Sequence, residues 1–272
     1  MPEQPHDLGY RSTEIWMPGG NTRAMKADPE PRAVLVAVTR SGTLQVRRLA
    51  PSLPGAVVIV ADAHAPLLAG ISNAVTPYSG ALSGCIPGLF AGFDQLVFCL
   101  SVGAVVRLIA PHLGSKYRDP GVLAIDDAAR FVVPVLSGHV GGANAYAERL
   151  ADLLGATAVI TTASDVAGTI AVDILGRELG WHLEAPRINL TRVAARLVDG
   201  EPVAFVQEAG SQDWWPGPGP LPENIKLFAR FEDVDLDRYP AVLLVTRREI
   251  PSSLWQRLEE RLLVYRPPED QP

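Results

Sequence analysis

Residues 136–165 read LSGHVGGANAYAERLADLLGATAVITTASD, and their pattern indicates the fold of the chain. This stretch begins at the end of an apolar run of β type, Phe131–Leu136, and passes through a glycine-rich turn that contains His139. The apolar residues that follow recur at the spacing of one helix face: Ala143, Tyr146, Ala147, Leu150, Leu153 and Leu154. Ala156–Ile160 is a second β-type run. A strand, a turn, a helix and another strand in this order indicate an α/β fold.

Polar side chains follow both strands of this unit. They are Ser137, His139 and Asn144 after the first strand, and Thr161, Thr162, Ser164 and Asp165 after the second. In open α/β sheets, ligands bind outside the carboxyl ends of the strands, where helix N-termini present unpaired N–H groups to anions. We therefore expect the functional site at this edge of the sheet.

The chain before this stretch contains further buried strands. Mostly apolar runs, typical of strands covered on both faces in a parallel sheet, are Ala33–Val38, Ala56–Val60 and Gln95–Leu100. A tight strand pair is predicted from Val122–Ile125 and Phe131–Val135, and helices are predicted at Val102–Leu113 and, despite its glycines, at Leu82–Phe93. Residues 32–165 are therefore predicted to form a flavodoxin-like or Rossmann-like α/β domain with a parallel sheet. Residues 1–31 lack periodicity and are predicted to be a disordered tail.

A second, smaller α/β domain is predicted at residues 166–266. Its helices are expected at Ile170–Leu179 with Gly180 as C-cap, at Leu190–Leu197 and at Ser252–Arg261. Its strands are expected at Val203–Gln207, Ile225–Ala229 and Ala241–Thr246. The segment Trp214–Glu223 is predicted to be a loop because its prolines lack N–H donors, and residues 267–272 are predicted to be a fraying tail.

Composition excludes several classes of protein. The 272 residues are 47% hydrophobic and 20% charged, an ordinary globular profile with enough material for one large or two smaller domains. The net charge of −6 argues against nucleic acid or an acidic membrane surface as a partner. Cys85 and Cys99 fit neither a disulfide framework nor a metal site, which indicates a reducing cytoplasm. The sequence has no apolar run of about 18 residues, so neither a signal peptide nor a membrane span is expected.

Common nucleotide and hydrolase motifs do not fit the glycine-rich turn. The turn Gly138–Gly142, GHVGG, is not GxGxxG, lacks the Lys-Ser/Thr of a P-loop, and does not place a serine as GxSxG does. An unrelated nucleotide-binding module is therefore disfavoured. The histidines show no pair at metal-ligand spacing, so no protein-held metal is expected.

A second group of candidate residues lies in SVGAVVRLIAPHLGSKYRDP, residues 101–120. Arg107 falls on a predicted helix, and Lys116, Arg118 and Asp119 fall in the loop after it. Guanidinium and ammonium groups are suited to binding carboxylates. The alternative is a solvated loop with an arginine that extends from an apolar helix.

Structural alternatives also remain open for the turn. His139 can be a structural hydrogen-bonding residue, although the glycines beside it leave room for a ligand. Asn144 can be a plain first-turn helix residue, and Thr161, Thr162 and Asp165 can cap the helix that follows.

Two segments of the chain resemble a known family. LSVGAVVRLIAPHLGSKYRDPGVLAIDD and FVVPVLSGHVGGANAYAERLADLLGATAVITTASD carry the VRxxAP, KxxDPxV, LSGHxGGAN and VITTA(T/S)D signatures of the CbiG-type cobalt-precorrin-5A hydrolases. Residues 169 to about 230 resemble the middle region of that family more loosely, and its usual C-terminal domain is not found after Tyr265. The resemblance implies an enzyme of cobalamin biosynthesis that opens the ring A δ-lactone of cobalt-precorrin-5A. Release of acetaldehyde then gives cobalt-precorrin-5B.

The implied reaction assigns roles to the candidate residues. His139 is the expected general base, with Asp119 or Asp165 orienting it or sharing the role, and Ser137 is a further candidate for catalysis. The residues expected to bind the polycarboxylated substrate or its oxyanion are Arg107, Lys116, Arg118, Gly141, Gly142, Asn144, Thr161 and Thr162. No cofactor is expected, because the cobalt arrives in the substrate. The alternative is a non-catalytic corrinoid-binding or scaffold subunit that needs a separate C-terminal-domain partner.

Overall fold

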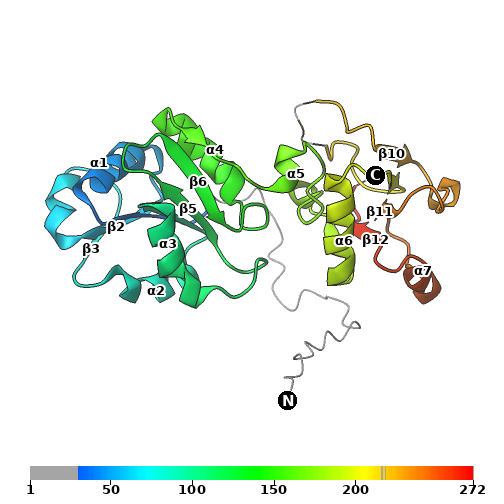
Figure 1. Ribbon diagram of the computed structural model, residues 1–272, viewed down its shortest axis with the longest axis horizontal. Helices are drawn as coiled ribbons and strands as arrows, with labels where there is room; N and C mark the ends of the chain where they lie inside the picture. Colours follow the sequence, from blue (N-terminus) through cyan, green and yellow to red (C-terminus); the bar gives the residue numbers. More distant parts are fainter. Residues whose placement is uncertain (1–29, 216, 218, 272) are drawn as a thin grey trace, which may run out of the picture. The chain divides into compact units, whose positions relative to one another are not determined.

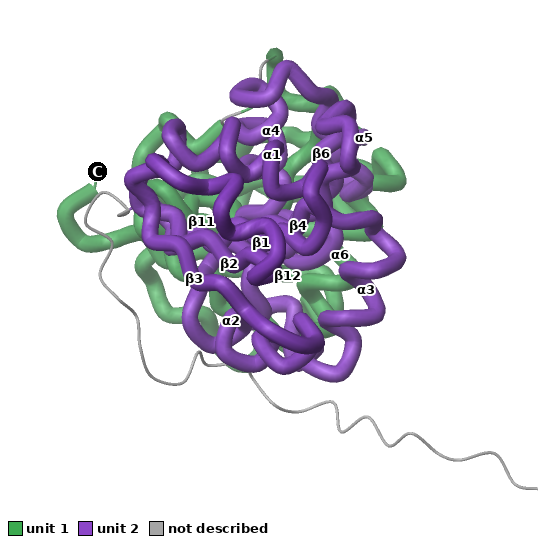
Figure 2. The backbone as a smooth tube through the Cα atoms, turned by 90° about the vertical axis from the view of Figure 1, so that its left-hand side faces the viewer, with its two compact units in different colours: residues 1–24, 167–272 green, residues 25–166 purple. Residues whose placement is uncertain are grey.

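The computed structural model describes residues 30–215, 217 and 219–271. The disordered tail predicted for residues 1–31 therefore lies almost entirely outside the described residues. The chain divides into two compact units, one that ends at Val166 and one that begins at Ala167 (Figure 2). We call the unit that ends at Val166 the first unit (purple, 'unit 2' in the key of Figure 2) and the unit that begins at Ala167 the second unit (green, 'unit 1' in that key). Each has a sheet and a hydrophobic core of its own.

The first unit is built on a seven-stranded sheet with the strand order β3-β2-β1-β4-β5-β6-β7. The strands are β1 (Ala33–Ala37), β2 (Val57–Ala61), β3 (Val75–Tyr78), β4 (Gln95–Cys99), β5 (Gly121–Ile125), β6 (Phe131–Leu136) and β7 (Thr157–Ala158). All neighbouring pairs are parallel except β5 and β6, which are antiparallel. The order of the first five strands is that of a Rossmann-like sheet, so the predicted α/β class is confirmed.

The antiparallel pair changes which strand ends lie together. β6 and β7 run against the other strands, so they end at the edge where β4 and β5 begin. We call this edge the β6 edge. The crevice of a doubly wound sheet normally lies at the opposite edge, outside the carboxyl ends of the parallel strands. The polar residues after β6 and β7 therefore share an edge with the loop that leads into β5.

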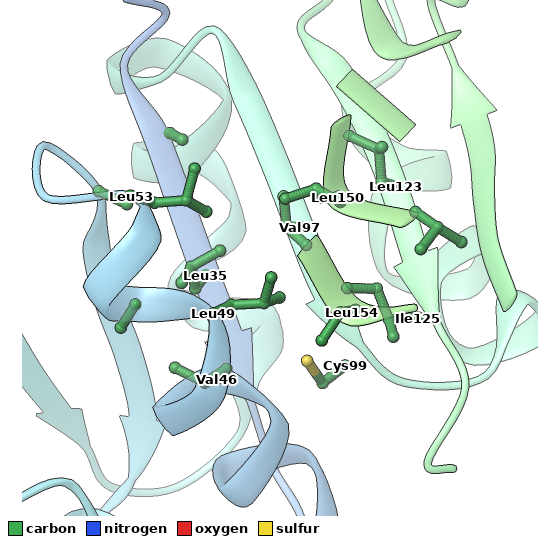
Figure 3. Packing of buried hydrophobic residues seen from close by; sticks show 14 of the residues in the cluster. Leu35, Val46, Leu49, Leu53, Val97, Cys99, Leu123, Ile125, Leu150 and Leu154 are labelled. Atoms are coloured by element: carbon green, nitrogen blue, oxygen red, sulfur yellow. The ribbon is translucent and has the colours of Figure 1, made fainter. Parts of the chain in front are cut away.

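Helices cover both faces of this sheet (Figure 1). They are α1 (Arg40–Leu49), α2 (Ile86–Gly92), α3 (Val102–Ile109) and α4 (Ala143–Leu154). The short α5 (Ala163–Val166) follows β7 and has no buried residue. On one face, Leu49 of α1 and Leu150 of α4 pack on alternate strand residues such as Leu35, Val97 and Leu123 (Figure 3). The remaining strand residues pack against α2 and α3 on the other face. Because every central strand is buried on both faces, its sequence is continuously apolar.

The second unit has a five-stranded sheet with the order β10-β9-β11-β12-β8, parallel except for the pair β12–β8. Its elements are β8 (His182–Glu184), α6 (Arg187–Val198), β9 (Val203–Gln207), β10 (Ile225–Phe228), β11 (Ala241–Val245), α7 (Ser252–Arg257) and β12 (Leu262–Arg266). The segment between β9 and β10 forms no helix or strand in its described residues, in agreement with the predicted loop.

Several predictions for the second unit are wrong. Ile170–Leu179 forms turns and a single 3-10 turn rather than a helix, because Gly176 has a left-handed φ of 69° and the Trp181 ring packs against its Cα. The helix predicted at Ser252–Arg261 ends at Arg257, and β12 follows without having been predicted. The segment after Pro267 does not fray, since Gln271 Oε1 accepts a hydrogen bond from Trp181 Nε1 at 2.9 Å.

Three elements of the first unit, α1, β3 and the short α5, were also not predicted. The strand expected at Ala156–Ile160 shrinks to the two residues of β7. β7 lies at the end of the sheet and pairs only with β6, so little holds it extended. No helix in the described part of the chain has both the length and the apolar character to cross a membrane.

Candidate functional site

The turn after β6 is closed by its own backbone. Ser137 has a left-handed φ of 55°, which is uncommon for a residue with a side chain. Three amides then donate back into the turn: Gly142 N to His139 O at 2.9 Å, Ala143 N to Ser137 O at 3.2 Å, and Asn144 N to Gly138 O at 3.0 Å. Gly142, also left-handed, is the N-cap of α4. We call residues 137–142 the His139 turn, and it presents His139 at the β6 edge.

The side chains after β6 and β7 meet at one carboxylate. Asp165 Oδ2 lies 2.8 Å from His139 Nε2 and accepts a hydrogen bond of 2.8 Å from Asn144 Nδ2. Thr162 Oγ1 also donates to it, and itself accepts from Asn144 Nδ2 at 2.7 Å. We call His139, Asn144, Thr162 and Asp165 the Asp165 cluster. Thr161 is exposed next to it.

The cluster holds Asp165 in its charged form. Burial by itself raises the pKa of Asp165, but the hydrogen bonds from Thr162 and His139, the charge of His139 and the hydrogen bond from Asn144 outweigh it, so the pKa is lowered. Asp165 is therefore a carboxylate that only accepts hydrogen bonds. The contact with His139 then places a proton on Nε2, and the tautomer with one proton carries its basic lone pair on Nδ1.

Ser164 lies beside the same imidazole, with its Oγ 3.3 Å from His139 Nε2. In a Ser-His-Asp triad the carboxylate and the serine contact different ring nitrogens. Here Asp165 and Ser164 both contact Nε2, and the shorter of the two contacts is with Asp165. The proton on Nε2 is therefore donated to Asp165 and not to Ser164. The geometry therefore favours an imidazole base that activates a water molecule over a serine nucleophile.

The loop before β5 lies against the His139 turn. A Cβ on Gly141 would be 3.0 Å from Gly121 N and 2.4 Å from Ser137 Cβ, so the two backbone segments touch. Lys116 and Arg118 are exposed on this loop, and Lys116 Nζ lies 4.9 Å from the centre of the Tyr117 ring. The structure therefore places two cations on the loop that adjoins the turn.

Arg107 is exposed in the last turn of α3, and its Nη1 lies 3.5 Å from Gly103 O of the same helix. Among the described residues it has no hydrogen bond or ion pair to the Asp165 cluster, and neither have Lys116 and Arg118. The three cations are thus exposed groups near or outside the turn and not members of the cluster.

Three expected site residues are used differently. Asp119 accepts hydrogen bonds from Gly114 N at 3.0 Å and Ser115 N at 3.1 Å, so it shapes the loop and does not orient His139. The N–H of Gly142 is already donated to His139 O, and is not available to a ligand. Ser137 Oγ is buried and has no hydrogen-bond partner in the described part of the chain.

Sequence reasoning gave no role to Ser164 and read Gln95 as an ordinary strand residue. Gln95 is 4% exposed, and its Nε2 donates to Gly141 O at 2.5 Å. In the sequence, Gln95 differs from its neighbours only as one amide at the start of the apolar run QLVFC. Periodicity alone cannot distinguish such a residue from an ordinary polar residue at the end of a strand.

The second unit contains a cleft of about 770 Å³ between residues 231–237 and 248–257. One of its walls carries Arg248, which is held by Glu208 at 2.7 Å and Glu232 at 2.9 Å. None of its lining residues belongs to the Asp165 cluster. The Asp165 cluster is the better candidate for chemistry, because among the described residues a carboxylate with a lowered pKa contacts an imidazole only there. Among the described residues, no group of His, Cys, Asp and Glu side chains is arranged to hold a metal ion.

The geometry defines an α/β protein with a His-Asp site at the β6 edge, and comparison with known proteins gives its family. Residues 85–165 match the family model "Cobalamin synthesis G N-terminal", and residues 170–267 match "Cobalamin biosynthesis central region". The chain therefore belongs to the CbiG family through its N-terminal and central regions, as its sequence signatures suggested. The first match contains the whole His139 turn and the Asp165 cluster.

The names of similar proteins fit this family assignment. The chain is 44% identical over 191 residues to a cobalt-precorrin-5A hydrolase of Priestia megaterium, covering 70% of this chain and 50% of the relative. It is 32% identical over 197 residues to the cobalt-precorrin-5A hydrolase of Salmonella typhimurium, an alignment that covers 69% of this chain and 53% of the relative. It thus spans about half the length of the curated relatives it matches. A solved structure of a putative cobalamin biosynthesis protein G homolog from Sulfolobus solfataricus is also similar. The alignment covers 87% of this chain and 60% of the solved chain, with 19% sequence identity and a TM-score of 0.45.

The lowered pKa of Asp165 predicts a pH-dependent contribution to stability. A carboxylate whose pKa is lowered in the folded state stabilises it fully above the unfolded value, about 3.9, and this contribution is lost as the pH falls through the folded value. Asp165→Asn should therefore destabilise the first unit at neutral pH, and the difference from the parent should shrink in acid. Urea unfolding at about pH 7 and about pH 3 measures this. A difference that stays constant with pH would contradict the prediction.

Proposed function

We propose that this chain carries the catalytic region of a cobalt-precorrin-5A hydrolase, which opens the ring A δ-lactone and releases acetaldehyde. The observation that carries the proposal is the contact of 2.8 Å between His139 and Asp165, within the segment that matches the family's N-terminal region. The names of the two relatives support the same reaction. We further propose that the reaction takes place in the cytoplasm, consistent with the two free cysteines.

The first step is hydrolysis of the lactone. His139 takes a proton from water, and the resulting hydroxide adds to the lactone carbonyl. Asp165 holds the imidazole in one orientation and stabilises the imidazolium that forms. The tetrahedral oxyanion needs hydrogen-bond donors, for which Thr161 and the N–H of Gly141 are candidates at the same edge. Collapse breaks the carbon–oxygen bond, and the alkoxide recovers the proton from His139.

The second step breaks a carbon–carbon bond in the manner of a retro-aldol reaction. His139 removes the proton of the newly formed hydroxyl, the carbonyl of acetaldehyde forms, and the bond to the macrocycle breaks. The electron pair enters the conjugated macrocycle, which then takes up a proton. One base at one position therefore serves both steps, which is consistent with a single imidazole at the site.

The substrate is a polycarboxylated macrocycle, so a binding surface with positive charge is required in a protein with a net charge of −6. Lys116 and Arg118 on the loop before β5, and Arg107 on α3, are exposed and suited to this role. We propose no cofactor of the protein itself, because the cobalt is part of the substrate.

A direct assay tests the proposed reaction. The purified chain is incubated with cobalt-precorrin-5A, and acetaldehyde is measured, with and without the C-terminal half of a relative supplied as a separate protein. We expect slow turnover by the chain alone and faster turnover with the added half, because a covering domain excludes water and fixes orientation. Corrinoid binding without acetaldehyde in both arms would favour the scaffold alternative. Full activity of the chain alone would show that no such partner is needed.

His139→Ala should reduce turnover by on the order of 10²-fold or more, because a general base is removed, while corrinoid binding changes little. His112→Ala is the matched control. His112 lies in the 3-10 turn after α3 beside Phe90, with ring centres 6.0 Å apart, and it belongs to no part of the cluster. Single-turnover rates and absorbance titrations of the corrinoid separate the two effects. Normal turnover by a folded His139→Ala variant would mean that His139 is not the base and has a structural role instead.

Lys116→Ala and Arg118→Ala should weaken corrinoid binding, and binding by the parent should weaken with rising salt, because contacts between exposed charges are screened. Arg107→Ala should act in the same direction. The control is Arg40→Ala, since Arg40 is also exposed but begins α1 at the edge opposite the β6 edge. Dissociation constants at low and high salt measure the effect. Salt-independent binding would mean that apolar contacts hold the macrocycle.

A further inference from the structure

A buried amide lies beneath the His139 turn. Gln95 is the first residue of β4, between β1 and β5, and its side chain is on the sheet face covered by α4, as its alternation with Leu96 requires. Its Nε2 donates to Gly141 O at 2.5 Å. The oxygen of the same amide, Oε1, is buried without a hydrogen-bond partner among the described residues. The amide thus connects the centre of the sheet to the turn.

Glycines make room for this amide. A Cβ on Gly121 would lie 2.2 Å from Gln95 Oε1, and a Cβ on Gly142 would lie 3.4 Å from its Nε2. Gly121 has no left-handed φ, so its backbone conformation does not require a glycine. The close approach of the Gln95 amide is the physical reason for a glycine at position 121.

Stability alone does not account for this arrangement. Two buried polar atoms, Gln95 Oε1 and Ser137 Oγ, lack a hydrogen-bond partner in the described part of the chain, which is unfavourable for folding. Ser137 is also in the left-handed region. Such unfavourable features persist where the surrounding structure enforces them and gather at functional sites. The amide of Gln95 holds this turn from below, in addition to the turn's own backbone hydrogen bonds.

We infer that Gln95 is a positioning residue for the reaction proposed above, on which this inference rests: it acts on His139 through the backbone of the turn. Gln95 Nε2 fixes Gly141 O, and the next amide, Gly142 N, fixes His139 O at 2.9 Å. Two successive hydrogen bonds therefore join the sheet to the residue that carries the base. Without the first, the turn is free to shift relative to Asp165, whose place is set by Thr162 and Asn144.

The test compares Gln95→Met, which keeps the length of the side chain but removes the amide, with Asn73→Leu. Asn73 is a matched control, because it is also buried, donates to two backbone carbonyls (Leu53 O and Ala56 O), and has a buried oxygen without a partner, but it holds the loop before β2. A second variant, Gly121→Ala, keeps the amide and displaces it. Two readouts are used: kcat and KM for acetaldehyde release, and the imidazole NMR signals of His139 in the free protein, assigned with His139→Ala.

We expect Gln95→Met and Gly121→Ala to shift the His139 signals and to lower kcat by on the order of 10²-fold with little change in KM. Asn73→Leu should lower thermal stability but leave both readouts unchanged. Unshifted His139 signals in either folded Gln95 or Gly121 variant, or an equal loss of kcat in Asn73→Leu, would overturn the inference. If the parent chain shows no turnover, the proposed function fails, but the NMR comparison still decides whether Gln95 positions His139.

Discussion

The antiparallel pairing of β6 with β5 is the constraint on which the site depends. β1, β2, β3, β4 and β5 form a parallel sheet in Rossmann-like order, and an ordinary further parallel strand would have placed its carboxyl end at the usual ligand-binding edge. Reversal at β6 moves the following turn to the edge where β4 and β5 begin. The first residue of β4 and the loop before β5 thereby become neighbours of the His139 turn, although they are distant in sequence.

A single carboxylate organises the side chains at this edge. Asp165 is partly exposed, and a carboxylate in such a position keeps its charge only if hydrogen bonds compensate for lost hydration. Three donors from the ends of β6 and β7 provide this compensation, and one of them is the imidazole. The same interaction that keeps Asp165 charged therefore fixes the orientation and the tautomer of His139. The hydrogen bonds that keep Asp165 charged are therefore the same ones that would prepare His139 for the proposed base catalysis.

Local pattern was sufficient for much of the fold. Continuous apolar runs identified β1, β2, β4, β5 and β6, since central strands are covered on both faces. The helix that became α4 followed from its apolar spacing. The pattern failed at Ile170–Leu179, where helical spacing is present but the packing of Trp181 on Gly176 decides the backbone. It also failed for β12, because an apolar run next to a predicted helix cannot be assigned from periodicity alone.

The amino-acid pattern was enough to predict the α/β class, the family and a site at the edge shared by the ends of β6 and β7, because these consecutive strands are joined by one helix. Which aspartate contacts His139 depends on the tertiary structure: the sequence left Asp119 and Asp165 as alternatives, and the fold brings Asp165 to the imidazole while Asp119 binds the backbone of its own loop. The tertiary structure alone revealed Gln95 as well. The contact of that amide with Gly141 spans 46 residues and depends on the lateral order of strands, which no local pattern encodes.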